Sequence, residues 1–390
     1  MFNHPPTRIL DERRSPAGII RHSRRWSTAL AILAMTATAA LAGCTGSPGG
    51  DSATQPSSIA VADRSARSDA LLVEQLTADQ PGCSAAVAID GRVVWAGARG
   101  LANLADRTPL TTVTKFDIAS VSKQFTATAV LLLSFDGLLR LSDPVSNYVR
   151  GLPGWAQRVT VDQLIHHTSG IPDYVQLLLE KRIFLAQPTT QQDALDAIAG
   201  VTELPVEPGT EFDYSNSNYV LLAEIVAVAA GRSLPDVLTD RVFSQLGLDM
   251  VMSPNLTGPD VATGYWTING TITPMVARWA QLGDGSIFST PTELVKWADN
   301  YVTGQLGGPQ LLAAITAGAV RDEQMPGAQY GAGIVITPEG AIFHPGKWAG
   351  NMSFLTISAD RRTAVAGSCN AEDGIDVEGV FGGIQAIWFE

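Results

Sequence analysis

Phe116-Asp-Ile-Ala-Ser-Val-Ser-Lys-Gln-Phe-Thr126 joins the end of a short apolar strand to a long apolar helix, which we expect over residues 120–138. Because an α-helix has about 3.6 residues per turn, Ser120 and Lys123 would lie on one face of it, one turn apart. At a helix start, Ser120 would also meet free backbone N–H groups and the positive end of the helix dipole. A serine hydroxyl becomes a good nucleophile when a base takes its proton, and a desolvated lysine can be that base. The pair indicates nucleophilic catalysis, with an ordinary surface pair as the alternative.

The composition of the whole chain narrows the class of protein. It has 390 residues, of which 45% are hydrophobic and 16% are charged. This is enough for one large domain or two medium ones with a well-buried core. The formal net charge is −12, and the chain is more acidic still without its arginine-rich N-terminus. Such a protein is poorly suited to bind nucleic acid or anionic lipid head groups, so neither is expected as a partner.

The N-terminus has the pattern of an export signal. Several arginines precede an apolar run over 27–42, which ends in Leu41-Ala-Gly-Cys44. The run is too short for a membrane span, and its end resembles a bacterial lipobox, in which Cys44 would be lipidated. We therefore expect a lipoprotein signal peptide over 1–43 and a protein anchored to the outer face of the bacterial cytoplasmic membrane. An ordinary cleaved signal is the alternative, and the choice between Sec and twin-arginine export stays open.

The other cysteines and the histidines bear on disulfides and metals. An exported compartment permits a disulfide between Cys83 and Cys369, and two small buried thiols are the alternative. Two thiols so far apart in the chain do not form a metal site. His166 and His167, with one distant histidine, are too few ligands for a catalytic metal. Neither a metal nor another cofactor is expected.

Local patterns predict the order of elements along the chain. Strand patterns stand near both ends, and helical patterns broken by Pro and Gly fill the middle. The expected segments are a flexible tether over 44–65, a helix over 64–80, a hairpin over 84–97, several helices over 139–283, a helix over 290–301, strands over 331–337, 341–344, 353–358 and 363–368, and a closing helix over 377–388. The fold class is therefore α+β, with an antiparallel sheet built from both chain ends, flanking helices and an inserted all-helical lobe. Such a topology places a cleft between the lobes.

Asp213-Tyr214-Ser215-Asn216 is the second segment whose residues suit an activated serine. A tyrosine phenol near a lysine ammonium can relay the serine proton, because the cation favours the phenolate. The Asn216 amide could contact a substrate carbonyl. A polar turn that leads into the helix at Val220 is the alternative.

Ile342-Phe-His-Pro-Gly-Lys347, in an expected strand, is the third segment. Acyl transfer needs two N–H donors aimed at the developing oxyanion. An edge strand that carries a glycine, here Gly346, lets a substrate approach the backbone closely. His344 is the one histidine of the exported chain in such a context.

These three segments together resemble the serine β-lactamase and penicillin-binding superfamily, nearest the class C and D-alanyl-D-alanine peptidase branch. The resemblance covers about residues 66–390 and includes Leu164-Ile-His-His-Thr-Ser-Gly-Ile-Pro-Asp-Tyr174. It implies a β-lactamase/transpeptidase-like domain, with an α/β lobe about 66–125 and 290–390 and a helical lobe about 126–289. In this fold the first and last strands are antiparallel neighbours, which makes a Cys83–Cys369 bridge plausible.

The resemblance also implies a role for each matched residue. Ser120 would be the acylated nucleophile, Lys123 its base and Tyr214 the proton shuttle. Asn216 would contact the substrate, His344 would orient Tyr214, and the backbone N–H groups of Ser120 and Lys347 would form the oxyanion hole. His166 and His167 are interpreted as structural.

Pro345 departs from the family pattern, in which this position carries a hydroxyl that holds a substrate carboxylate. Proline offers neither a hydroxyl nor an N–H, and a neutral His344 gives less positive field than a lysine. Lys347, on the same strand face as Pro345, could restore a cation. We therefore expect an exported serine hydrolase of small-molecule or short-peptide esters or amides, with weak or absent β-lactamase activity. A lipid-anchored protein that binds penicillin or wall peptide without turnover is the alternative.

Overall fold

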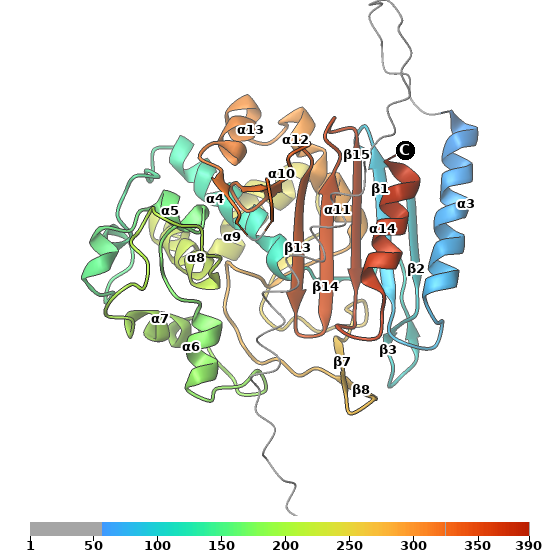
Figure 1. Ribbon diagram of the computed structural model, residues 1–390, viewed down its shortest axis with the longest axis horizontal. Helices are drawn as coiled ribbons and strands as arrows, with labels where there is room; N and C mark the ends of the chain where they lie inside the picture. The colour runs from blue at the N-terminus through green and yellow to red at the C-terminus, as the bar shows by residue number, and fades with distance from the viewer. Residues whose placement is uncertain (1–56, 324, 390) are drawn as a thin grey trace, which may run out of the picture.

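A large antiparallel sheet organises the computed structural model, which describes residues 57–323 and 325–389. Its strand order is β10-β11-β12-β13-β14-β15-β1-β2 (Figure 1). The bounds of these strands are β10 Val320–Arg321, β11 Gln329–Tyr330, β12 Val335–Ile336, β13 Ile342–Trp348, β14 Asn351–Ile357, β15 Thr363–Cys369, β1 Cys83–Ile89 and β2 Arg92–Arg99. The expected α+β fold with a sheet made from both chain ends is confirmed.

Strand β1 joins the two ends of the chain, because it pairs with β2 on one side and with β15 on the other. Its side chains alternate between the two faces of the sheet, as the pleat requires. Val87 belongs to a core with α3 (Ser58–Gln75) and α14 (Val377–Trp388). Ala86 belongs to the opposite core, which includes residues of α11 (Pro291–Ala298). The sheet is therefore covered by helices on both faces, as Figure 1 shows.

Helix α3 begins earlier than expected. Ser57 caps its N-terminus by accepting a hydrogen bond from the backbone of Ala60, and the helix runs from Ser58 to Gln75. Residues 58–65 therefore belong to a helix and not to the expected tether. Leu72, within the helix, and Leu76, the extended residue that ends it, are buried against the sheet. The expected signal peptide over 1–43, Cys44 and residues 45–56 of the expected tether lie outside the described residues.

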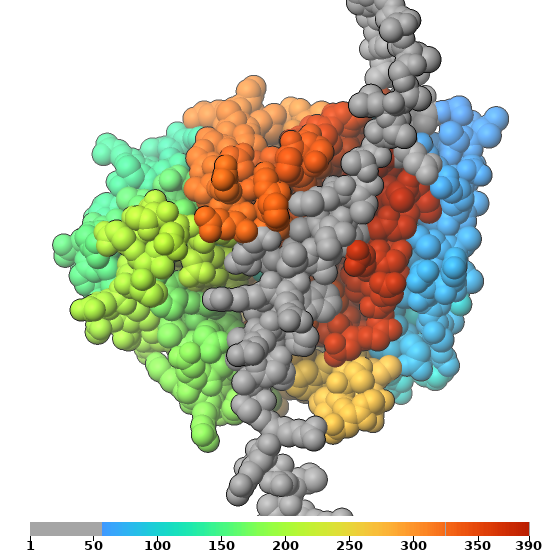
Figure 2. All heavy atoms as spheres, in the orientation of Figure 1, coloured from blue at the N-terminus to red at the C-terminus, as the bar shows by residue number. Residues whose placement is uncertain are grey.

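The helical lobe lies on the side of the molecule opposite α3 (Figure 2). Its helices are α4 Lys123–Phe135, α5 Val161–Ile165, α6 Tyr174–Glu180, α7 Gln191–Ala199, α8 Asn216–Ala230, α9 Leu234–Leu238 and α10 Ser244–Leu246. The lobe expected to be all-helical to residue 289 is not so, because short strands follow α10: β6 Val251–Met252, β7 Tyr265–Ile268, β8 Thr271–Pro274 and β9 Ile287–Ser289. The remaining strands and α-helices are β3 Leu101–Asn103, β4 Thr108–Pro109, β5 Phe116–Asp117, α12 Asn300–Thr303 and α13 Gly308–Thr316. Short helical segments of other types are η2 Val145–Asn147, η3 Gly154–Gln157 and η4 Thr239–Phe243.

A disulfide joins the first and last strands of the chain. Cys83 and Cys369 are register partners in the β1–β15 ladder, with their Cα atoms 4.0 Å apart, and their sulfurs are bonded. The bond links residues 286 positions apart. In the part of the chain that the structure describes, no helix has the length and apolar character needed to cross a membrane.

Candidate active site

Ser120 lies in a tight turn between β5 and α4. The turn is η1 (Ala119–Ser122), a 3-10 segment, so the α-helix begins at Lys123 and not at Ser120 as expected. Ala119 takes a left-handed backbone conformation, with φ of 49°, and its N–H donates to Asp117 Oδ1 at 2.8 Å. Burial raises the pKa of Asp117 to about 7. The Ser120 side chain is left half-buried at the edge of a cleft.

Lys123 is fully buried beside Ser120 and has three oxygen neighbours. Its Nζ lies 2.9 Å from Ser120 Oγ, 2.8 Å from Asn216 Oδ1 and 2.8 Å from the backbone oxygen of Asp284. The last two oxygens can only accept hydrogen bonds. A neutral amine has two N–H groups and one lone pair, so donation to these acceptors directs the lone pair at the Ser120 hydroxyl. The geometry therefore suits Lys123 as the base for Ser120.

Aromatic rings enclose the Lys123 amine. Nζ lies 5.0 Å from the ring centre of Tyr214 and 5.5 Å from that of Tyr219. These distances fit cation–π contacts, which favour the ammonium form that follows proton uptake. The Tyr214 ring stacks on the buried His167 ring, with centres 4.2 Å apart. Tyr214 thus lies beside Lys123, as expected for a proton shuttle, and its hydroxyl has no hydrogen-bond partner among the described residues.

His344 does not hold Tyr214 in the way that the resemblance implied. Its Nε2 lies 3.1 Å from Tyr330 Oη and its Nδ1 lies 2.6 Å from the Pro345 carbonyl oxygen. The rings of His344 and Tyr214 are 6.5 Å apart. Burial lowers the pKa of His344 to about 3, so the ring is neutral near pH 7. The buried face of β13 brings His344 to Tyr330. Tyr214 instead packs against His167, and this contact orients its ring.

Gly346 allows a close contact between β13 and the nucleophile's turn. A Cβ on Gly346 would lie 2.3 Å from the Ile118 carbonyl oxygen and 3.1 Å from the Ser120 backbone nitrogen. Only glycine fits so close an approach. The contact sets the backbone of β13 directly against that of Ser120, the arrangement expected for an oxyanion hole formed by Ser120 and Lys347.

The Lys347 side chain reaches the cleft but already has an anionic partner. Its Nζ lies 2.9 Å from Glu372 Oε2, and it is about a third exposed. The cation expected to compensate for Pro345 is therefore neutralised in part by Glu372. The face assignment along β13 agrees with the burial, since Pro345 and Lys347 are half-buried and His344 and Gly346 are buried.

Asn216 is held from two sides at the start of α8. Its Oδ1 accepts from Lys123, while its Nδ2 donates to Asp173 Oδ2 at 2.9 Å. Its backbone N–H donates to the same oxygen at 3.1 Å. Burial raises the pKa of Asp173. Asn216 therefore positions Lys123, and its side chain also lines the cleft where we expected a substrate contact.

The cleft at Ser120 contains residues that had no predicted role. They are Tyr174, Trp279, Gln281, Asp284, Gly285, Ser286 and Trp348. Tyr174 ends the segment that carried part of the family resemblance, so its position gave some signal. Trp279 and Asp284 come from a long connection after β8, and no local pattern there distinguishes them from other loop residues.

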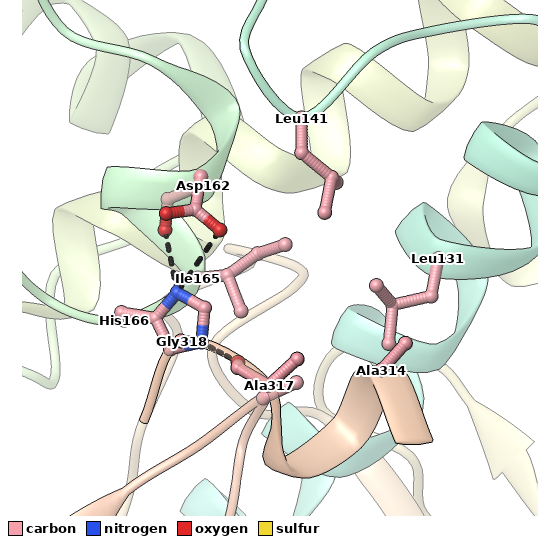
Figure 3. A pocket seen from close by; sticks show the side chains of 9 residues that line it. Leu131, Leu141, Asp162, Ile165, His166, Ala314, Ala317 and Gly318 are labelled. Atoms are coloured by element: carbon pink, nitrogen blue, oxygen red, sulfur yellow. Dashed lines mark hydrogen bonds and ion pairs between the residues drawn. The ribbon is translucent and has the colours of Figure 1, made fainter. Parts of the chain in front are cut away.

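His166 lies outside this cleft, at a second pocket whose other lining residues are mostly apolar (Figure 3). Its Nδ1 faces the backbone oxygen and a carboxylate oxygen of Asp162, and its Nε2 faces the Ala317 carbonyl oxygen at 3.1 Å. Burial alone would lower the pKa of His166, but the hydrogen bonds and charge of Asp162 outweigh it and the pKa is raised. The described residues contain no cluster of His, Cys, Asp and Glu suited to a metal.

The geometry of Ser120, Lys123 and Tyr214 agrees with a comparison against protein families. The family model named Beta-lactamase matches residues 69–379. The chain belongs to the β-lactamase family. The predicted resemblance is therefore confirmed, and membership supports the predicted class of enzyme, a serine hydrolase.

Relatives of this β-lactamase family member include peptidases and penicillin-binding proteins. A D-aminopeptidase of Brucella anthropi is 29% identical over 307 residues, which is 75% of this chain and 57% of that protein. Penicillin-binding protein 4* of Bacillus subtilis (strain 168) is 32% identical over 163 residues, 41% of this chain and 35% of that protein. The chain thus spans little more than half the length of the D-aminopeptidase.

Solved structures of the same fold extend the comparison. The octameric penicillin-binding protein homologue from Pyrococcus abyssi has a TM-score of 0.71 at 24% identity, over 85% of this chain and 78% of that one. The D-amino acid amidase from Ochrobactrum anthropi SV3 has a TM-score of 0.69 at 24% identity, over 83% and 96%. Both comparisons show that the fold of this chain is similar to that of the solved structure.

Proposed function

We propose that this β-lactamase family member is a serine hydrolase that cleaves small amides or esters of amino acids through an acyl-enzyme on Ser120. The observation that carries the proposal is the contact of Lys123 Nζ with Ser120 Oγ at 2.9 Å, with two further acceptors that direct its lone pair. The similarity to D-aminopeptidases supports amino-acid amides as the substrate class.

The residues of the site fit each step of acyl transfer. Ser120 Oγ bonds to the substrate carbonyl carbon while its proton passes to the Lys123 amine. The backbone N–H groups of Ser120 and Lys347 stabilise the resulting oxyanion. The bond to the leaving amine or alcohol then breaks, and the proton reaches that group from Lys123 through Tyr214 Oη. Water hydrolyses the ester on Ser120 by the same proton path in reverse.

The carboxylate clamp of a β-lactamase is weak in this cleft. Pro345 supplies no hydroxyl, His344 is neutral, and Glu372 pairs with Lys347. A substrate whose leaving part carries a carboxylate, as penicillin does, would therefore gain little binding energy from these residues.

A Pro345→Thr variant restores the hydroxyl, and we expect it to be acylated by penicillin about tenfold faster, because a hydrogen bond to a charged group contributes roughly 1.5–3 kcal/mol.

The test is intact mass spectrometry of the purified protein after exposure to p-nitrophenyl acetate and to benzylpenicillin, beside a turnover assay on the ester. We expect ester turnover that the Ser120→Ala variant lacks, with little penicillin adduct. A lasting penicillin adduct on Ser120 without ester turnover would favour a non-turnover binding protein. The absence of both ester turnover and a penicillin adduct would contradict the proposed acyl-enzyme.

We also propose that the protein is exported and anchored through a lipid on Cys44. The Leu41-Ala-Gly-Cys44 pattern supports this. So does the disulfide, since disulfides persist in oxidising compartments. In a bacterial host that expresses the full chain, we expect an alkyne fatty acid to label the protein in the membrane fraction. The label should be lost in the Cys44→Ala variant, and equal labelling of the variant would contradict lipidation.

A further inference from the structure

Asp284 is the cleft residue whose carboxylate the reaction above does not use. Its backbone oxygen accepts from Lys123, which leaves its side chain for another purpose. Oδ2 accepts a hydrogen bond from Tyr174 Oη at 3.1 Å. Apart from Tyr174 and its own backbone N–H, the Asp284 carboxylate has no hydrogen-bond donor among the described residues, and Asp284 is half-buried at the cleft wall. The cleft therefore contains a carboxylate oxygen with unused acceptor capacity.

Aromatic rings stand beside this carboxylate. Tyr174 and Trp279 have ring centres 6.1 Å apart, and Trp279 and Trp348 have ring centres 5.9 Å apart, so the three rings form a continuous series along the cleft. Aromatic faces attract cations, and a carboxylate forms its strongest hydrogen bonds with charged donors. A carboxylate next to such a series is chemically suited to an organic ammonium group.

The position of Asp284 relative to Ser120 selects which part of a substrate would reach it. Lys123 Nζ contacts both Ser120 Oγ, at 2.9 Å, and the Asp284 backbone oxygen, at 2.8 Å. The backbone of Asp284 is thus separated from the nucleophile by a single side-chain amine, and both residues line the same cleft. In an α-amino acid derivative, the nitrogen is two bonds from the carbonyl carbon that Ser120 would attack. A substrate nitrogen so close to the attacked carbon would lie in the part of the cleft that Asp284 and Tyr174 line.

We propose that Asp284, with the ring series Tyr174–Trp279–Trp348, binds the free ammonium group of the acyl part of the substrate. The inference rests on the proposed function and narrows its substrate class to acyl donors with an unblocked amine. A blocked amine, an N-acyl group or an anionic acyl part would lose the ion pair with Asp284. The enzyme would thus act at the amino end of a short peptide or on a simple amino-acid amide.

Other charges near the site are compatible with this assignment. Lys347 forms an ion pair with Glu372, which reduces the positive field of its ammonium group at Asp284. Burial raises the pKa of Asp284, with the opposing influence of Lys123, and a bound ammonium would offset that burial by stabilising the carboxylate. A purely structural Asp284, present to accept from Tyr174, would show no preference for amines. The two roles can therefore be separated by experiment.

The experiment compares phenylalanine p-nitroanilide, as each enantiomer, with 3-phenylpropionyl p-nitroanilide, which lacks only the amine. For the wild type we expect kcat/KM of the better enantiomer to exceed that of the des-amino compound by at least about tenfold. In Asp284→Asn this ratio should fall towards one, and in Asp284→Glu it should be kept in part. Asp240→Asn makes the same change at an exposed carboxylate of the helical lobe and should keep the wild-type ratio. An unchanged ratio in Asp284→Asn would overturn the inference.

A second measurement needs no variant and so does not depend on its folding. Benzylammonium and benzyl alcohol compete with p-nitrophenyl acetate in the wild type, and the ammonium should inhibit at a concentration at least about tenfold lower. Equal inhibition would overturn the inference while ester turnover upholds the proposed function. Loss of the proposed function itself would appear as an absence of any acyl adduct on Ser120, which overturns both.

Discussion

At the scale of single residues, the chemistry depends on how Lys123 is surrounded. The residue is buried, no carboxylate of the described residues is in hydrogen-bond contact with it, and its Nζ instead meets a hydroxyl, an amide oxygen and a backbone oxygen. Neutral oxygens accept from either protonation state of the amine, so they hold it in place while it gains and loses a proton. A carboxylate in the same place would favour the ammonium throughout. Asn216 and Asp284 therefore position the base without blocking its function.

We predict that Lys123→Met lowers kcat/KM for p-nitrophenyl acetate by about 10²–10⁴-fold, the usual contribution of a general base. Methionine can fill the buried volume without requiring a partner for a charge. Steady-state kinetics measure the loss. Lys181→Met, at an exposed position, is the control and should keep wild-type rates. Retention of activity in Lys123→Met would mean that another group takes the Ser120 proton.

At the scale of elements, the site is assembled by the contact between β13 and η1. The turn that carries Ser120 and the strand that carries Lys347 belong to segments more than 200 residues apart. They meet because Gly346 has no side chain to separate them. The oxyanion hole that we propose exists only if this spacing is kept within a few tenths of an ångström.

We predict that Gly346→Ala lowers kcat/KM by at least about tenfold and destabilises the fold by roughly 1–3 kcal/mol, because the new Cβ would collide with the Ile118 carbonyl oxygen. Kinetics and urea unfolding measure the two effects. Gly154→Ala, where a Cβ would meet open space, is the matched control and should be neutral. A variant of Gly346 with normal kinetics would show that the close approach is not needed for catalysis.

At the scale of the whole molecule, the sheet depends on strands from both ends of the chain. β1 pairs with β15, and the Cys83–Cys369 bond closes this pairing. The bond restricts the unfolded chain over a loop of 286 residues. In the chain-entropy view, long loops gain most from such a bond, although measured effects vary.

We predict that the double variant Cys83→Ala/Cys369→Ala is less stable than the wild type by about 2–5 kcal/mol, as for other native disulfides. Urea unfolding under oxidising conditions measures the difference, and reductant should bring the wild type close to the variant. Equal midpoints for the oxidised wild type and the double variant would contradict the expected role of the bond.

The buried histidines lead to a second prediction, which concerns how the free energy of unfolding depends on pH. The pKa of His344 is lowered to about 3, mainly by burial, so between pH 3 and 6.5 the unfolded chain binds a proton there that the folded chain does not. Stability is therefore lost as pH falls below about 6.5, by up to roughly 1.4 kcal/mol per pH unit. His344→Gln should make the drop in unfolding free energy between pH 7 and pH 5 smaller by about 2 kcal/mol.

His166 provides a control for the direction of this pH dependence of stability. Its pKa is raised in the fold, so its contribution is present at low pH and lost as pH rises through the folded pKa. His166→Gln should therefore make the acid-side drop larger, where His344→Gln makes it smaller. Urea unfolding at pH 5 and pH 7 measures both. Shifts in the same direction for the two variants would contradict the assigned protonation states.

The sequence by itself determined the features that depend on neighbours along the chain. The hairpin around Asp90-Gly91 and the closing helix at 377–388 formed as expected, since turn chemistry and apolar periodicity act over a few residues. The motif spacing also located Ser120, Lys123 and Asn216, which come together in space. The start of α3 was misjudged because a Ser-capped helix can begin in a segment whose composition is typical of a linker.

Only the tertiary structure decided which distant groups become partners. His344 meets Tyr330, Lys347 meets Glu372, and Asp284 enters the cleft through a long connection without a motif. Each of these contacts depends on the angle and distance between elements, which packing of the whole core sets to within an ångström. A local pattern carries no record of that geometry, and so the charges of the cleft, on which the substrate class depends, follow from the folded molecule alone.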